Sequence, residues 1–280
     1  MTRPAPDPAQ PSGEARPVEV AVAQHARPVG DAAANREHLA RLVESHADVD
    51  LVVFPELHVT GYDLDALAAR GSELAEHPTT GETASLVGRL STRHRLTIVV
   101  GFLERGAGGA LHNSVLIAAP GRPPARYRKS HLYPAELPVF AAGHDLPVVA
   151  TPAGVLGPQI CFEHAFPAIS TSQALAGAEV LVIPSAVGDD HEHLIEVRTR
   201  ARAQDNQVFA IAANSNSPGF CGHSMVVDPR GRVLVAAGHA DTVLRASLDL
   251  SEIAAERQRE PSLRMMRPDL YGAVGGPAPS

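Results

Sequence analysis

The 280-residue sequence has only two cysteines and no tryptophan, and long hydrophobic runs are absent. Two cysteines in a chain of this length cannot build a disulfide framework, so we expect a reduced, cytoplasmic setting. No uninterrupted apolar run is long enough to cross a bilayer, and residues 1–17 lack the apolar core of a signal peptide. The sequence therefore predicts no membrane partner.

Positive charge is also scarce. The chain has 24 Lys and Arg residues against 31 Asp and Glu residues, which gives a net charge of −7. Without a basic stripe to neutralise phosphates, we expect no nucleic-acid partner. A hydrophobic content of 44% and a charged content of 20% are ordinary for a soluble globular protein.

Short apolar runs alternate with segments of helical periodicity along most of the chain. Residues 1–17, rich in Pro and Ala, predict a disordered leader; residues 18–272 predict a single domain and residues 273–280 a tail. Strands are predicted at 18–23, 51–54, 97–102, 113–118, 148–150, 155–160, 180–184 and 208–213, and helices at 32–46, 82–94, 168–176, 193–206 and 251–259. Residues 225–228, 233–236 and 242–248 predict a closing antiparallel set. This order favours an α/β domain whose sheets are covered by helices.

Cys161 lies in the stretch GPQICFEHAFP (157–167), between an apolar run predicted as a strand and an apolar helical segment. At such a turn the N–H groups of a helix start favour the nucleophilic thiolate. A free cysteine is more often a small packed hydrophobe, and this is what we expect of Cys221. A catalytic role for Cys161 therefore needs a base and oxyanion donors elsewhere in the chain.

Two charged residues stand where they could meet Cys161 in one core. Glu56 ends the run LVVFPE, and Lys129 lies in YRKSHL. Burial raises the pKa of a carboxyl group, which suits a general base near neutral pH, and an ammonium favours a thiolate or an oxyanion. Each residue alone is more commonly part of a surface ion pair. None of the 14 histidines stands out by position as a base.

Taken together, FPE, YRKSHL and QICFEHAFP, in this order, resemble the Glu–Lys–Cys motifs of the nitrilase (carbon–nitrogen hydrolase) superfamily. Five stretches agree over about residues 18–271: FPELHVTGYD (54–63), HNSVLIAAPG (112–121), RARAQDNQVFAIAAN (200–214), GHSMVVDPRGRVL (222–234) and MRPDLYG (266–272). The resemblance implies a four-layer α-β-β-α sandwich that needs no metal or organic cofactor. It also implies a homodimer or larger homo-oligomer, in which helices of two copies form a central layer.

The resemblance assigns roles to five positions. Glu56 is the expected general base, Cys161 the nucleophile and Lys129 the cation that stabilises the tetrahedral intermediate. The backbone N–H of Phe162 is expected to complete the oxyanion hole. Glu136, in YPAELPVF, is expected to orient Lys129, with a solvated loop carboxylate as the alternative.

Four positions depart from the family pattern. Ala168 stands where Glu often follows Phe-Pro, Glu163 stands where Asp is common, and Asp205 replaces Glu in a Glu-Asn-Gln triplet. Pro158 interrupts the strand before the cysteine. Because none of these touches the triad, we expect them to affect the pocket wall and the choice of substrate.

The expected reaction is thiolate attack on an electron-poor carbon, followed by hydrolysis of the thioester. VTGYD, RARAQDNQ and CGHS most resemble the branch that hydrolyses small aliphatic amides, including ω-amino acid amides such as 5-aminopentanamide. Hydrolysis of N-carbamoyl amines or amino acids is the alternative, since those enzymes share the triad. A nitrilase is less expected, because no Trp-Glu follows the cysteine. A catalytically silent binding protein is the alternative from another class, and the intact triad argues against it.

Overall fold

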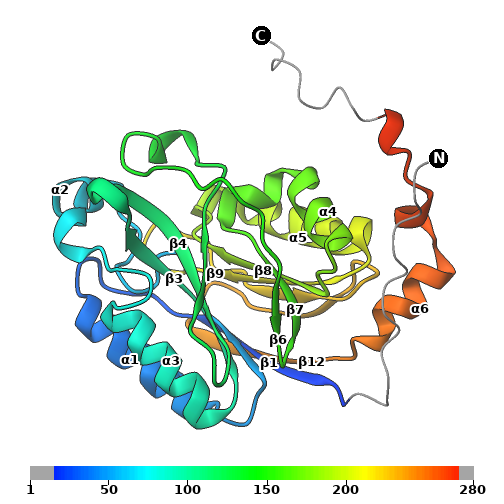
Figure 1. The fold of residues 1–280 in the computed structure, drawn as a ribbon, viewed down its shortest axis with the longest axis horizontal. Coiled ribbons are helices and arrows are strands. Elements are labelled where there is room, and N and C mark those ends of the chain that lie inside the picture. The colour runs from blue at the N-terminus through cyan, green and yellow to red at the C-terminus, as the bar shows by residue number, and fades with distance from the viewer. Residues whose placement is uncertain (1–15, 271–280) are drawn as a thin grey trace.

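Two six-stranded sheets pack face to face in the computed structural model, which describes residues 16–270 (Figure 1). The predicted tail and nearly all of the predicted leader lie outside the described residues. The strands are β1 (Val18–Gln24), β2 (Leu51–Val53), β3 (Thr97–Arg105), β4 (Leu111–Ala118), β5 (Ala125–Arg128), β6 (Val149–Thr151), β7 (Gly154–Pro158), β8 (Val180–Ser185), β9 (Phe209–Asn214), β10 (Met225–Val227), β11 (Val233–Ala236) and β12 (Thr242–Leu248). The helices are α1 (Ala32–Ser45), α2 (Leu64–Leu74), α3 (Glu82–His94), α4 (Pro167–Leu175), α5 (Glu192–Asn206) and α6 (Ser251–Arg259).

Strand direction decides which loops meet at one edge. The first sheet has the order β12-β1-β2-β3-β4-β5; β1, β2 and β3 are parallel, while β4 is antiparallel to both β3 and β5. Strands β2 and β5 therefore run in the same direction and end at the same edge. The second sheet has the order β11-β10-β9-β8-β7-β6, with β7, β8 and β9 parallel.

Three apolar cores separate the layers. Because side chains alternate along a strand, Val20 and Val22 of β1 face the core between the sheets, whereas Ala21 and Ala23 face the core beneath α1 and α3. A third core lies between the second sheet and helices α4 and α5. Figure 1 shows α1 and α3 on one side of the paired sheets and α4 and α5 on the other. The predicted α-β-β-α sandwich is confirmed.

Most predicted elements are present, and α3 and α6 have the predicted bounds. Helix α2 was not predicted, because its weak helix formers Gly71 and Ser72 interrupt the pattern. The signal for it was Asp63, whose side chain accepts a hydrogen bond from the backbone N–H of Ala66 and caps the helix. Within residues 16–270, no helix is both long enough and apolar enough to cross a membrane.

The antiparallel set predicted at 225–228, 233–236 and 242–248 is present, but its third strand pairs elsewhere than expected. Strands β10 and β11 pair in the second sheet, but β12 crosses to the first sheet and lies antiparallel to β1, with Val18 opposite Leu248. The apolar residues Leu244 and Leu248 of β12 join the core between the sheets. Burying this apolar face of β12 between the sheets stabilises the fold more than pairing β12 with the β10–β11 hairpin would.

Candidate active site

The three predicted site residues come from two different sheets. Glu56 follows β2 and Lys129 follows β5 at the same edge of the first sheet, and Cys161 follows β7 of the second. The structure brings Glu56 and Lys129 into direct contact, with the Lys129 Nζ donating to Glu56 Oε1 at 2.8 Å. The Cys161 thiol lies close enough to both charges for each to influence its pKa.

Lys129 is an almost fully buried ammonium between two carboxylates. Its side chain is 1% exposed, and its Nζ also lies 2.8 Å from Oε2 of Glu136. Burial acts to lower the pKa of Lys129, but the nearby charges of Glu56, Cys161 and Glu136 outweigh burial and raise it. Lys129 is therefore a permanent cation in the site.

Glu136 is part of this cluster and is not a solvated loop carboxylate. It ends a short 3-10 turn, Pro134–Glu136, and its side chain is fully buried. Its Oε2 accepts a hydrogen bond from the backbone N–H of Tyr133 at 2.7 Å, and its Oε1 accepts one from the Tyr62 hydroxyl at 3.1 Å. These contacts hold the carboxylate against Lys129.

Asn113 is a site residue that the sequence did not single out. From β4, its side-chain amide donates to Glu56 Oε1 at 2.7 Å and to Glu136 Oε1 at 2.9 Å. It bridges the two carboxylates, which also share the Lys129 ammonium. The sequence did contain a sign of this role, an amide within the apolar run HNSVLI. A polar side chain buried in a strand needs hydrogen-bond partners.

One carboxylate oxygen of Glu56 is free to accept a proton. Oε1 accepts from Lys129 and Asn113, whereas Oε2 is buried and has no hydrogen-bond partner among the described residues. Burial raises the pKa of Glu56, with Lys129 opposing and the charge of Glu136 adding to the shift. A carboxylate with a raised pKa and a free oxygen is suited to accept a proton.

Cys161 adopts a left-handed backbone conformation, with φ 47°, at the start of the 3-10 turn Cys161–Ala165. The helix predicted at 168–176 begins at Pro167, beyond the 3-10 turn that carries Cys161. Burial, followed by the charge of Glu56, raises the pKa of Cys161, while Lys129 and a backbone hydrogen bond from Ala186 oppose the rise. The expected preference for the thiolate is therefore wrong for the resting site, and the thiol needs a base.

The other cysteine is packed, as predicted. Cys221 is 3% exposed, and the side-chain amide of Asn214 donates to its Sγ at 3.3 Å. Burial raises the pKa of Cys221 to about 11. It lies among backbone groups and has no carboxylate base in hydrogen-bond contact among the described residues.

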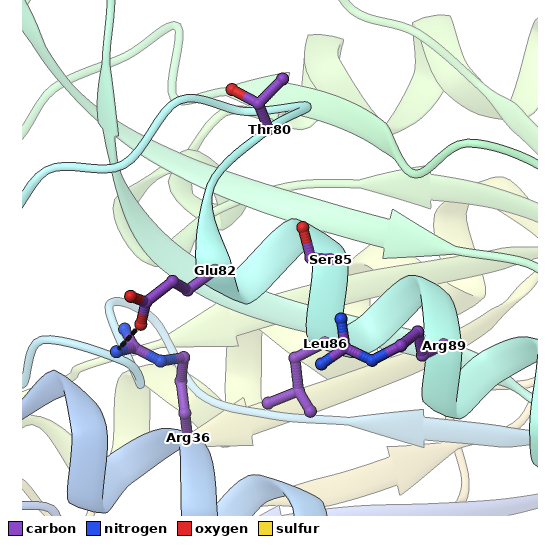
Figure 2. A pocket seen from close by; sticks show the side chains of 6 residues that line it. All are labelled: Arg36, Thr80, Glu82, Ser85, Leu86 and Arg89. Atoms are coloured by element: carbon purple, nitrogen blue, oxygen red, sulfur yellow. Dashed lines mark hydrogen bonds and ion pairs between the residues drawn. The ribbon is translucent and has the colours of Figure 1, made fainter.

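A surface hollow of about 350 Å³ lies away from these residues, over helices α1 and α3 (Figure 2). It is lined by Arg36, Thr80, Glu82, Ser85, Leu86 and Arg89. In Figure 2 Arg36 is paired with Glu82, so its charge is already neutralised. Across residues 16–270, no three His, Cys, Asp or Glu side chains are grouped so as to hold a metal ion.

A four-layer sandwich that buries a lysine between two glutamates beside a cysteine belongs to the nitrilase superfamily of hydrolases. The carbon–nitrogen hydrolase family model matches residues 19–258, and the chain therefore belongs to this family. The chain is 32% identical to an (R)-stereoselective amidase from a Pseudomonas species over 87% of this chain and 89% of that protein. It is 27% identical to the omega-amidase NIT3 of Saccharomyces cerevisiae over 92% of this chain and 96% of that protein.

Solved structures agree with this assignment. The crystal structure of a carbon–nitrogen hydrolase from Helicobacter pylori G27 superposes with a TM-score of 0.85 at 26% identity, covering 92% of this chain and 98% of that one. The protein is thus a carbon–nitrogen hydrolase.

Proposed function

We propose that this enzyme hydrolyses a small aliphatic amide, such as an ω-amino acid amide, to a carboxylate and ammonia through a thioester on Cys161. The observation that carries the proposal is the buried ammonium of Lys129 between Glu56 and Glu136, beside a thiol whose pKa is raised. Such a site supplies a base, a nucleophile and a fixed positive charge without further groups.

In the first half-reaction, Glu56 takes the proton of the Cys161 thiol through its free oxygen, and the sulfur attacks the amide carbon. The carbonyl oxygen becomes an oxyanion, stabilised by Lys129 and the backbone N–H of Phe162. The C–N bond then breaks, and the nitrogen leaves as ammonia with the proton held by Glu56. A thioester on Cys161 remains.

In the second half-reaction, Glu56 takes a proton from water and the resulting hydroxide attacks the thioester carbon. Collapse of the intermediate releases the carboxylic acid, and the thiolate recovers its proton from Glu56. Glu136 keeps Lys129 in place throughout, through the contact at 2.8 Å. No other titrating residue is needed to balance the protons.

Sequence similarity supports a small aliphatic amide in two ways. The relatives named above are an amidase and an omega-amidase. The sequence stretches around VTGYD, RARAQDNQ and CGHS are similar to those of the aliphatic amidase branch.

The test is ammonia release from a panel of linear amides, ω-amino acid amides, ureido acids and nitriles at equal concentration. We expect the highest kcat/KM for a linear or ω-amino amide. A higher value for a ureido acid would replace the proposal with N-carbamoyl hydrolysis. Nitrile turnover above all amides would replace it with nitrilase activity.

A further inference from the structure

Glu163, two residues after Cys161, has a completely buried carboxylate that the mechanism above does not use. It is surrounded by hydrogen-bond donors. Its Oε1 accepts from the Tyr127 hydroxyl at 2.6 Å, the Ser130 backbone N–H at 2.8 Å, the Ser130 hydroxyl at 2.5 Å and the His131 backbone N–H at 3.2 Å, and its Oε2 accepts from the Ile160 backbone N–H at 2.7 Å. So many short bonds on one carboxylate fix its position.

The donors belong to both halves of the site. Ser130 follows Lys129 directly and continues from β5 in the first sheet. Ile160 precedes Cys161 directly and continues from β7 in the second sheet. A single carboxylate thus joins the backbone next to the cation to the backbone next to the nucleophile.

Glu163 is held as an anion without a lysine or arginine partner among the described residues. Burial acts to raise its pKa, but hydrogen bonds from His131, Ser130 and Tyr127 outweigh burial and lower it. The ionised form accepts every one of these bonds. A glutamine would replace one acceptor oxygen by a donor NH₂ group facing other donors.

The bond to Ile160 also spans the turn that contains Cys161. Residues 160 and 163 bracket the nucleophile, whose backbone is left-handed, with φ 47°. A non-glycine residue keeps this conformation only where its surroundings impose it. The Glu163 carboxylate supplies one such constraint from within the turn.

We propose that Glu163 is a positioning residue that sets the placement of the Cys161 sulfur relative to the Lys129 ammonium. This rests on the proposed function, in which these two groups act on the same carbonyl. Glu163 touches neither substrate nor reacting atoms in this scheme. Its effect therefore falls on the chemical steps more than on substrate affinity, because a misplacement of about 1 Å costs about 10²-fold in rate.

Glu76 offers a matched control, because it is also a largely buried carboxylate with several donors. It accepts from the Thr83 backbone N–H at 2.6 Å, the Thr83 hydroxyl at 2.7 Å and Arg36 at 2.8 Å. These partners lie at the outer helices α1 and α3, away from the catalytic edge. Glu76→Gln therefore tests the loss of a buried carboxylate without a link to the site.

The experiment compares Glu163→Gln, Glu163→Asp and Glu76→Gln with the wild type in the full-length enzyme, with the best amide of the panel. We expect Glu163→Gln to lower kcat about 10²-fold with KM changed less than about threefold, and to slow thioester formation on Cys161, measured by intact-mass spectrometry, to the same degree. Glu163→Asp, which keeps the charge, should recover part of kcat. Glu76→Gln should lower the melting temperature and leave kcat within about twofold.

Three outcomes bear on the proposal. If kcat of Glu163→Gln equals that of the wild type, or falls only with the folded fraction seen by circular dichroism, Glu163 does not position the site. If Glu163→Gln does not fold, Ser130→Ala removes one donor and should lower kcat about tenfold, and wild-type kcat there overturns the proposal instead. Cys161→Ala run alongside separates the two hypotheses, because activity in that variant refutes the proposed function itself.

Discussion

Charge balance constrains the protons at the active site. Lys129 contributes one positive charge, and Glu136 neutralises it through the 2.8 Å contact. Ionising both Glu56 and Cys161 would then place two uncompensated negative charges in a buried space. The two residues therefore hold one proton between them and titrate as a pair. Moving that proton from sulfur to carboxylate is the step that activates the nucleophile.

Cys161→Ala is expected to abolish hydrolysis and to keep the fold, since it removes a nucleophile from a half-buried position and little core volume. Cys161→Ser should be nearly inactive too, because a carboxylate is too weak a base to make a useful alkoxide. Ammonia release and the circular dichroism melting curve measure both properties. The packed residue gives the control: Cys221→Ala should keep near wild-type turnover. Activity of Cys161→Ala within about tenfold of wild type, roughly 1.4 kcal/mol in barrier, would contradict the assignment.

The Glu56→Gln variant tests whether Glu56 is a general base or only an ion-pair partner of Lys129. As a base, Glu56 serves both half-reactions, so the variant should lose turnover by at least about 10²-fold. Because deacylation needs the base as well, substrate should stay on Cys161 as a thioester. Intact-mass spectrometry after mixing with a good amide detects that adduct. Turnover like that of the wild type would remove Glu56 from the mechanism.

The pH dependence follows from the same residue. Burial raises the pKa of Glu56 above the ordinary 4.5, and the base acts only when ionised. The acid limb of kcat/KM should therefore lie above pH 4.5 and fall about tenfold per pH unit below it. Stability changes in the opposite sense, since a raised carboxyl pKa contributes stability that is present below 4.5 and lost as the pH rises through the folded-state pKa. A pH–rate profile with its acid limb at or below pH 4.5 would refute this.

Among the secondary-structure elements, strand β3 supports the turn that carries Glu56 through a glycine, Gly101, which has no side chain. Gly101 of β3 lies so close to this turn that an added Cβ would stand 2.4 Å from the backbone N of Leu57 and 2.6 Å from the Pro55 carbonyl oxygen. Gly101→Ala should push the turn away from Lys129. We expect activity to fall at least about tenfold, with a loss of stability of about 1–3 kcal/mol.

The control for this substitution is Gly88 in α3, where an added Cβ would meet only Pro124 at 3.7 Å. Gly88→Ala should keep activity and raise the free energy of unfolding by about 0.5–1 kcal/mol, because alanine is the better helix former. Steady-state kinetics and urea unfolding measure both variants. Equal activity in Gly101→Ala and the wild type would mean that the Glu56 turn adjusts without cost.

Elements with strong periodicity were predictable from the sequence, and their tertiary partners were not. The apolar run LVVF and helix α3 follow from local pattern alone. Pairing of β12 with β1 depends on which face is buried by the opposite sheet. Asn113 and Tyr62 join the site through contacts with Glu136, which lies far away in sequence. The positions of Glu56, Lys129 and Cys161 came from motif resemblance, because no local pattern identifies a buried charge.

For the molecule as a whole, we propose a dimer through the layer of α4 and α5. Leu175 and Val197 on these helices are 61% and 62% exposed, whereas no large exposed apolar side chain lies on the described helices α1 and α3. Such a layer buried between two copies forms a large apolar interface that survives dilution to micromolar concentration. Light scattering should give a mass of at least twice 29.4 kDa.

Val197→Asp should weaken this association by at least about tenfold, 1.4 kcal/mol, because it places a charge in the buried layer. Leu234→Asp, at a side chain 45% exposed on β11, is the matched control and should leave the mass unchanged. A monomer of 29.4 kDa for the wild type would exclude the shared layer. A dimer unaffected by Val197→Asp would place the interface elsewhere.

The division of the site between two sheets also has a consequence for the chain during synthesis. Strands β1 to β5 carry Glu56 and Lys129 and leave the ribosome before Cys161, and β12 completes the first sheet only after the second sheet has been made. A nascent chain therefore carries the base and the cation before it carries the nucleophile. Because the base and the nucleophile are held by different sheets, we expect hydrolysis to begin only once the two sheets have packed against each other.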